Sequence, residues 1–411
     1  MRIVERDHHL VVLDYCSPQA RSLCFLNSFH QLGLVSQAGK CGDFRYPNGV
    51  IMNAAVAALP RVASRKSLAI QTSIAILLCA GIALYFWTQS RYPALIKKYH
   101  SGNAIKVAGP ISFDALMPVT SDMPLRARIG RTTVNWMWTN RIGMTFGLFF
   151  GAGMLTLLPL MPAFRFRSAA AQTATGAATG IPLGVCANCV APIGRGLYQG
   201  GASPSTTLAT MISSPTLNVV VLAMALAMFP LKIALVRLAV PLILLALVPW
   251  IVRHNQIAAV TEDLSGSADG WIRPTSDTFK SYVKNVGSLA LTTIPLMVVA
   301  AFLGALVAEA VPAQSIPAKV TILGIVMVAL VGTFLPVPMA FDVALAFVLM
   351  ARGVPMPYVV TLLCTLGIFS IYPYLILGRT LSWRTATRVF AVVFVLGLAV
   401  GLGTALATHA F

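Results

Sequence analysis

The sequence predicts an all-α, polytopic membrane protein, and its composition, its apolar runs and its charge distribution support that class. Of its 411 residues, 57% are hydrophobic and only 10% are charged, whereas soluble domains carry about 25% charged residues. A single soluble core cannot bury that much apolar surface, so lipid must solvate most of the chain. Apolar runs of about twenty residues, the length of one bilayer crossing, recur along the sequence.

The net charge of the chain is +18, which in a soluble protein would suggest nucleic acid as a partner. Here the basic residues lie mostly between the apolar runs, where cations orient membrane helices and meet anionic headgroups. We therefore expect the lipid bilayer, and no nucleic acid, as the partner of this charge.

Residues 1–51 show neither helical periodicity nor the pattern of a signal peptide. We expect an N-terminal extension that is disordered or lies outside the translated protein, with Met52 as the start that is used. A metal site is the weaker interpretation of this stretch. Its ligands would be His8, His9, Cys16 and Cys24.

Residues 52–140 are predicted to hold the first transmembrane helix and a polar segment outside the cytoplasm. The apolar run 68–88 is long enough to cross a bilayer. Lys66 and its basic neighbours precede this run, which predicts that its N-terminal end is cytoplasmic. Residues 89–140 contain prolines and several arginines, too many charges for the membrane interior.

The rest of the chain is dominated by apolar runs and is predicted to form two repeats, 141–252 and 285–411, joined by the polar linker 253–284. The predicted spans are 142–161, 168–185, 205–229, 233–252, 285–308, 320–335, 357–378 and 385–406. Two further runs, 189–199 and 339–351, are too short to cross alone and are typical of half-helices or re-entrant segments. In all we expect about nine to eleven membrane segments.

An offset of 152 residues superimposes the two repeats, because it aligns Gly201 with Gly353 and Lys232 with Arg384. Each repeat holds an odd number of apolar segments, so the second would enter the membrane in the opposite orientation. This is the inverted-repeat plan of many secondary transporters, with a C-terminus outside the cytoplasm. Chance similarity between apolar sequences is the alternative.

The stretch from Gly180 to Asn218 is rich in Gly, Pro, Ser, Thr and Asn for a segment between membrane spans. Irregular backbone at membrane depth is tolerated only where protein buries it or water reaches it. Pro192 and Pro215 each remove an amide and favour a helix break. The neutral donors and acceptors near the break are Asn188, Ser213, Ser214 and Asn218. We treat these polar residues and prolines as candidate substrate contacts, with helix packing as the alternative.

Three motifs in this stretch carry a family resemblance: Cys186-Ala-Asn-Cys189-Val-Ala-Pro192, Gly200-Gly201-Ala202-Ser203 and Ser213-Ser214-Pro215-Thr216-Leu217-Asn218. They resemble the signature of the predicted-permease family that includes the ArsP-like organoarsenical efflux permeases. The resemblance covers residues 141–406 and implies a permease. Many members place one residue between the two cysteines, whereas this chain has two, so the substrate stays open.

Cys186 and Cys189 are candidate substrate ligands. Thiolates are soft ligands that suit arsenic(III)-like, Cu(I) and Zn centres, and two cysteines three positions apart can close on one atom. Two thiols are too few for a structural zinc site, so we expect no resident metal. Packing in a tight helix turn and a dithiol–disulfide redox role are the alternatives.

Arg195 and Asp342 are isolated charges in the two short apolar runs. Residues 141–251 contain no acidic side chain, and a charge at membrane depth is costly, so we expect a function or a partner for each. Because the offset makes the two short runs equivalent, we predict an Arg195–Asp342 salt bridge with a coupling or gating role. The alternative is that one or both snorkel to the membrane surface.

The sequence lacks the nucleotide-binding loop GxxxxGK[ST] and the HExxH and GxSxG motifs, so we expect no enzyme activity and no cofactor. The main interpretation is a secondary permease of a bacterial-type inner membrane. It would export a small soft or thiol-reactive solute of the organoarsenical, metal or sulfur-compound class. A membrane thiol/disulfide redox protein and a non-transporting membrane subunit are the alternatives, and a homodimer is left open.

Overall fold

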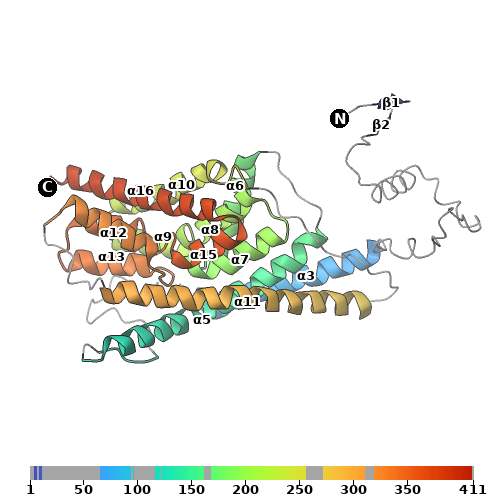
Figure 1. Ribbon diagram of the computed structural model, residues 1–411, viewed down its shortest axis with the longest axis horizontal. Coiled ribbons are helices and arrows are strands. Elements are labelled where there is room, and N and C mark those ends of the chain that lie inside the picture. The colour runs from blue at the N-terminus through green and yellow to red at the C-terminus, as the bar shows by residue number, and fades with distance from the viewer. Residues whose placement is uncertain are drawn as a thin grey trace, which may run out of the picture. The chain divides into compact units, whose positions relative to one another are not determined.

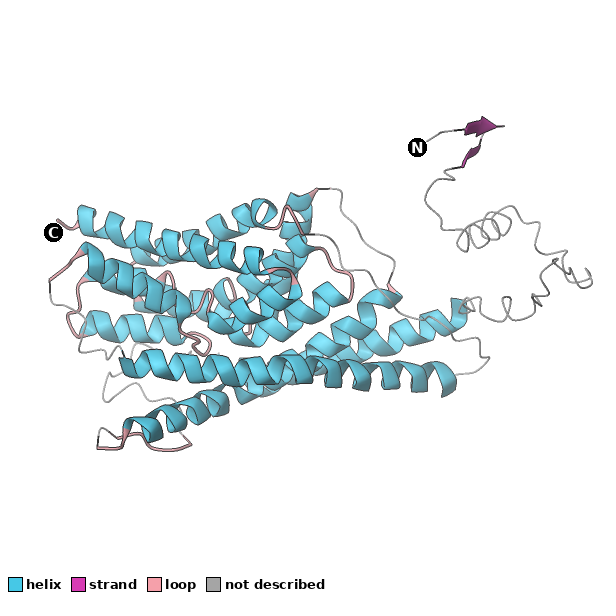
Figure 2. Cartoon of the chain, in the orientation of Figure 1, coloured by secondary structure: helices cyan, strands magenta, loops and turns pink. Residues whose placement is uncertain are grey.

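The computed structural model describes residues 4–6, 9–11, 65–93, 96, 116–120, 122–161, 168–255, 272–310 and 319–409. The chain divides into two units, 1–61 and 62–411. The first unit contains the antiparallel strands β1 (Val4–Arg6) and β2 (His9–Val11). The second unit is the helical bundle of Figures 1 and 2. Met52 and three of the four residues of the N-terminal metal interpretation, His8, Cys16 and Cys24, lie outside the described residues.

The helical unit confirms the all-α polytopic class. Five described helices are long and apolar enough to cross a membrane, and the pair α8 and α9, bent by 41°, makes a sixth crossing if it is counted as one span. The long helices are α3 (Arg65–Phe86, continued by the π-helical turn η2, Trp87–Arg91), α5 (Leu125–Leu157), α10 (Leu231–Ile251), α11 (Ile272–Ala310) and α16 (Trp383–Ala407). The shorter helices are α6 (Ala169–Leu183), α7 (Ala187–Gln199), α8 (Pro204–Thr216), α9 (Val219–Met228), α12 (Ile322–Phe334), α13 (Phe341–Ala351), α14 (Met356–Leu363) and α15 (Ile371–Thr380).

Polar caps explain where several helices begin. Ser168, Ser203 and Ser382 precede α6, α8 and α16, and each accepts a hydrogen bond from the amide three residues later. Such a bond satisfies a first-turn amide that has no partner within the helix. Pro204 occupies the first position of α8, where a missing amide costs nothing.

Two predicted boundaries fall inside helices. α5 begins at Leu125, so residues 125–140 are the first half of a continuous 33-residue helix and not part of a polar excursion. α11 begins at Ile272, inside the predicted linker. A helix of that length exceeds the roughly 30 Å hydrocarbon core, so its ends can carry charges. Arg128 of α5 pairs with Glu309 of α11 in this way.

The two repeats are copies of one helix order. α8, α9 and α10 begin at Pro204, Val219 and Leu231, and α14, α15 and α16 begin 152 residues later, at Met356, Ile371 and Trp383. Gly201 and Gly353 end α7 and α13 with positive φ angles of 97° and 78°. The amides that follow, of Ala202 and Val354, each bond the carbonyl five residues earlier, as in a Schellman helix end. One turn geometry at the predicted offset supports a true repeat over chance similarity.

Helices α6 and α7 form a re-entrant hairpin. α6 packs parallel to α8, with the Thr206 hydroxyl bonded to the Gln172 carbonyl near their beginnings and the Val185 amide bonded to Ser214 near their ends. The chain turns at Gly184, whose φ is 56°, and α7 leads back to the start of α8. The tip of this hairpin, residues 184–189, therefore lies inside the bundle.

Helices α12 and α13 form the equivalent hairpin of the second repeat, with residues 335–340 as its tip. α12 packs parallel to α14, with Gly324 against Tyr358 and Gly332 against Thr365. The second tip therefore lies beside the end of α14, as the first lies beside the end of α8.

The parallel course of α7 and α15 shows that the two repeats have opposite orientations. Ser370 bonds Asn188 near their N-termini, and Arg195 lies within electrostatic range of Arg379 toward their C-termini. Both helices thus lead to the same end of the bundle, while α12 and α14 start from the other. In Figure 1, α12 and α13 lie at the left of the bundle, and α6 and α7 lie to their right. The arrangement is the expected inverted repeat with discontinuous and re-entrant helices.

Candidate functional site

The tips of the two hairpins meet inside the helical unit. Asn188, in the first turn of α7, is fully buried and donates from Nδ2 to the carbonyl of Val337 in the opposite tip (3.0 Å). Its Oδ1 accepts a hydrogen bond from the Ser370 hydroxyl at the start of α15 (2.8 Å). Trp136 of α5 donates to the carbonyl of Pro336 in the same tip (2.8 Å). One predicted site residue thus joins segments of both repeats.

Cys186 and Cys189 lie at the tip of the first hairpin and form a disulfide, with their Cα atoms 5.0 Å apart. Cys186 is the N-cap of α7, and its sulfur accepts a hydrogen bond from the Cys189 amide (3.1 Å). Both residues are buried. Oδ1 of Asn140 lies 3.8 Å from the Cys186 sulfur, so a carboxamide of α5 is placed to accept from the reduced thiol.

Glycines of α5 set the position of the cysteine pair. A Cβ at Gly143 would lie 2.5 Å from the Cys189 sulfur, and one at Gly151 would lie 2.7 Å from the carbonyl oxygen of Pro192. Gly147 lies directly against the Cys189 backbone. Larger residues would push α7 away from α5, so close helix approach requires glycine at these positions.

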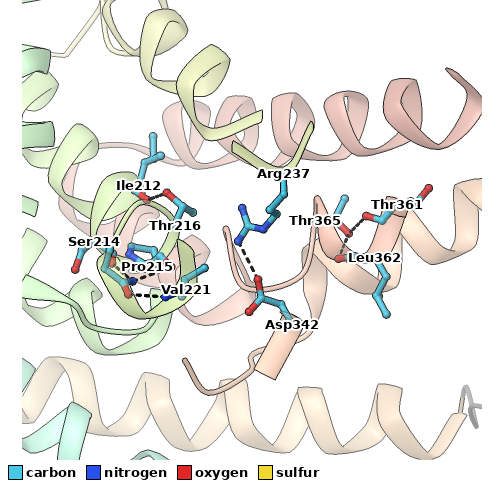
Figure 3. Close-up of polar contacts among 11 residues, drawn as sticks. Ile212, Ser214, Pro215, Thr216, Val221, Arg237, Asp342, Thr361, Leu362 and Thr365 are labelled. Atoms are coloured by element: carbon cyan, nitrogen blue, oxygen red, sulfur yellow. Dashed lines mark hydrogen bonds and ion pairs between the residues drawn. The ribbon is translucent and has the colours of Figure 1, made fainter. Parts of the chain in front are cut away.

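Asn218 holds the break between α8 and α9. Its Nδ2 donates to the carbonyls of Ser214 (2.7 Å) and Pro215 (3.2 Å), and its Oδ1 accepts from the amides of Val220 and Val221 (3.1 Å each). Figure 3 shows the break, with Ser214, Pro215 and Val221 labelled. The backbone uses both donors and both acceptor positions of this carboxamide. The structure therefore gives Asn218 a local role in shaping the break.

The other predicted residues of the first repeat lie around the same break. The hydroxyl of Ser214 accepts from the Val185 amide (3.2 Å) and so ties the hairpin tip to α8. Ser213 is fully buried and faces α6. Pro215 comes just before the break, as expected, whereas Pro192 is accommodated within α7 and does not end it.

The predicted Arg195–Asp342 salt bridge is wrong. Asp342 pairs instead with Arg237 of α10, whose Nη2 lies 2.8 Å from Oδ2, and the two side chains are only 2% and 3% exposed (Figure 3). Arg195 and Asp342 lie on hairpins that enter from opposite ends, and Arg195 is near Arg379. The missed signal is Arg237 itself, an arginine within the apolar run 233–252 that needs a partner at that depth.

In the view of Figure 3, the Arg237–Asp342 pair lies between the break that joins α8 to α9 and the end of α14. Gly367, in the segment between α14 and α15, has a φ of 78°, and a Cβ there would lie 3.0 Å from Cγ of Asp342. Cys364 is buried within electrostatic range of the pair. In the described part of the chain, Nε and Nη1 of Arg237 have no hydrogen-bond partner.

A separate groove of about 860 Å³ is formed by α3 and α5 and reaches Tyr282 of α11. Its lining is mainly apolar and includes Phe86 and Phe146, whose rings stack with centroids 3.9 Å apart. None of the predicted site residues lines this groove, so the groove and the meeting point of the two tips are distinct features.

Comparison with known proteins identifies a family. A family model described as ArsP_1, predicted permease, matches residues 142–405. The match covers well over half of the 411-residue chain and both repeats, and α3 lies outside it. A search of curated proteins and a search of solved structures gave no match. The chain therefore belongs to the predicted permease family ArsP_1, and it is a multi-pass membrane protein of the transporter class.

Proposed function

We propose that this chain is a secondary permease that exports a small soft or thiol-reactive solute, such as a trivalent organoarsenical, across a bacterial inner membrane. The observation that carries the proposal is the position of Cys186 and Cys189. Two buried sulfurs lie at a re-entrant tip where both inverted repeats meet. In transporters of this plan the substrate site lies at the repeat interface, and one repeat moves against the other around it.

The reduced cysteine pair would bind a soft centre by ligand exchange. A solute R–As(OH)₂ would exchange both hydroxyls for the two sulfurs, and the thiol protons would leave with the hydroxyls as two waters, without electron transfer. Cα atoms 5.0 Å apart already bring both sulfurs within reach of one atom. The disulfide form offers no thiolate, so the dithiol is the form that transports.

The buried Arg237–Asp342 pair is the best-supported place for coupling or gating. It joins α10 of the first repeat to α13 of the second, so movement between the repeats must strain it. The chain carries no nucleotide-binding loop, and an ion gradient or a partner would supply the energy.

Flux into liposomes tests the proposal. Liposomes that contain the reduced full-length protein should accumulate a labelled trivalent phenylarsenical. Cys186→Ser or Cys189→Ser should lower the rate of uptake about tenfold or more, because one thiolate binds a soft centre less tightly than two. Cys79→Ala is the matched control, since Cys79 is also a buried cysteine but is free and lies on α3. Its flux should stay at the wild-type level.

The same experiment separates the alternatives. A thiol/disulfide redox protein would stop working when the pair is held permanently reduced, and a non-transporting subunit would show no flux from purified protein. Flux that persists under reduction and depends on both sulfurs supports the permease.

A further inference from the structure

The guanidinium of Arg237 is incompletely used by the protein. Only Nη2 has a partner, Oδ2 of Asp342, whereas Nε and Nη1 have none among the described residues. A guanidinium can bind two oxygens along either of two edges, Nε with Nη2 or Nη1 with Nη2. Each of these edges of Arg237 therefore keeps a free donor, Nε or Nη1. The side chain is 2% exposed, and leaving buried charged donors unpaired is costly. These donors are open to a ligand, and a guanidinium edge matches the two oxygens of an oxyanion.

The fold itself does not require this ion pair. At the offset of 152 residues, Arg237 corresponds to Val389 and Asp342 corresponds to Val190. These valines are 0% and 1% exposed, so the other orientation of the same repeat builds the equivalent positions from apolar side chains. Buried ion pairs seldom improve stability over packed apolar residues. The repeat carries this ion pair at only one of two equivalent places, which favours a role in binding a ligand.

We propose that Arg237 binds an oxyanionic group of the transported solute, such as a sulfonate, carboxylate or phosphonate. When the solute is absent, the Asp342 carboxylate pairs with the guanidinium. This inference rests on the proposed permease function and adds the charge class of its substrate. The anion takes one two-nitrogen edge of Arg237 and displaces the Asp342 carboxylate.

Displacement couples anion binding to the uptake of one proton. A carboxylate left buried without its partner is unfavourable, so Asp342 is protonated as the anion binds, and the net charge of the site is unchanged. Among the described residues, Arg237 from α10 and Cys364 from the α14–α15 segment face Asp342. α9 and the tip 335–340 carry no ionisable side chain. The hydroxyl of Tyr358 on α14 bonds the segment before α12.

Titration of the purified full-length protein with benzenesulfonate tests this inference, because a sulfonate stays ionised throughout the accessible pH range. Over the pH range in which anion binding takes up one proton, the apparent Kd of the wild-type protein should rise about tenfold for each unit of increase in pH. Asp342→Asn should bind without that slope. Arg237→Gln should weaken binding about tenfold or more, because it removes the charged donors.

The double variant Arg237→Val with Asp342→Val copies the valines of the other repeat and serves as the folded control. It should unfold at least as cooperatively as wild type and bind no sulfonate. No binding by the wild-type protein, or equal binding by the double variant, would overturn the anion site. A pH slope that persists in Asp342→Asn would overturn the displacement of Asp342. Cysteine-dependent arsenical flux without sulfonate binding contradicts the anion site alone. Sulfonate binding without such flux contradicts the proposed solute class alone.

Discussion

The tips of the two hairpins occupy equivalent places in the repeat but carry different chemistry. The first tip presents two sulfurs and the buried carboxamide of Asn188. The second contains two prolines and is followed by the carboxylate of Asp342. Helix starts, the turns at Gly201 and Gly353, and the parallel packing of neighbouring helices agree between the repeats. The repeat thus provides a shared scaffold, and divergence between its two copies provides the side chains of the candidate site.

Divergence also explains why the polar contacts at the centre cross between the repeats. The first repeat supplies Arg237 and has no acidic residue, whereas the second supplies Asp342. Asn188 likewise finds its partners at Val337 and Ser370 of the other repeat. A movement of one repeat against the other must exchange these contacts, which is where binding energy can be coupled to motion.

The largest expected effect comes from removing one member of the buried ion pair. Arg237→Val should lower the free energy of unfolding by about 3–5 kcal/mol, because it leaves the Asp342 carboxylate buried and unpaired. The double valine variant should recover most of that loss. Denaturant unfolding of the purified protein in detergent measures both.

A double-mutant cycle on the other arginine provides a comparison for this prediction. Arg195→Gln and Asp342→Asn should be additive within about 0.5 kcal/mol, since the two residues lie on different hairpins and do not touch. Additive losses for Arg237 with Asp342, or strong coupling for Arg195 with Asp342, would contradict the observed pairing.

The glycine contact behind the first tip should give an intermediate effect. Gly147→Ala places a methyl group into the Cys189 backbone, and such overpacking costs about 1–3 kcal/mol. Gly130→Ala on the same helix has open space and should be neutral or stabilising by up to about 1 kcal/mol. Thermal unfolding compares the two variants, and equal effects would mean that α5 and α7 do not pack as closely as described.

Effects of similar or smaller size are expected at the contact between the tips. Asn188→Ala leaves the Val337 carbonyl and the Ser370 hydroxyl without their partner, at a cost of about 1–3 kcal/mol. Ser370→Ala removes one of these bonds and should cost less. Unfolding measurements on both variants rank them, and the reverse order would show that Asn188 is not the shared partner.

Much of the fold follows from the sequence because hydrophobic periodicity and helix breakers act locally. The two short runs, the break near Pro215 and the repeat offset all reappear in the structure. The start of α5 could not be predicted in this way. Residues 125–140 carry charges, as a loop would, but they belong to a helix that extends past the lipid. Local pattern favours helix or loop, but it does not measure how far a helix projects.

The geometry of the candidate site could be predicted only in part, because it depends on contacts between distant segments. The Cys186–Asn188–Cys189 cluster was identifiable from its local sequence motif, and the structure brings it to the meeting point of the repeats. The partner of Asp342 lies 105 residues away on α10, and a direct reading of the repeat offset pairs the wrong arginine. Asn218 offers donors in the sequence, but in the structure the carbonyls of Ser214 and Pro215 accept from them.

Reversible closing of the cysteine pair tests the central claim most directly. Flux of a labelled trivalent phenylarsenical into liposomes should be present in the reduced protein, fall to background when Cys186 and Cys189 are oxidised to the disulfide, and return on reduction. The double variant Cys186→Ser with Cys189→Ser should stay near background under all three conditions. Flux that is unchanged by oxidation, or that equals the wild-type rate in the double variant, would contradict a site built on these two sulfurs.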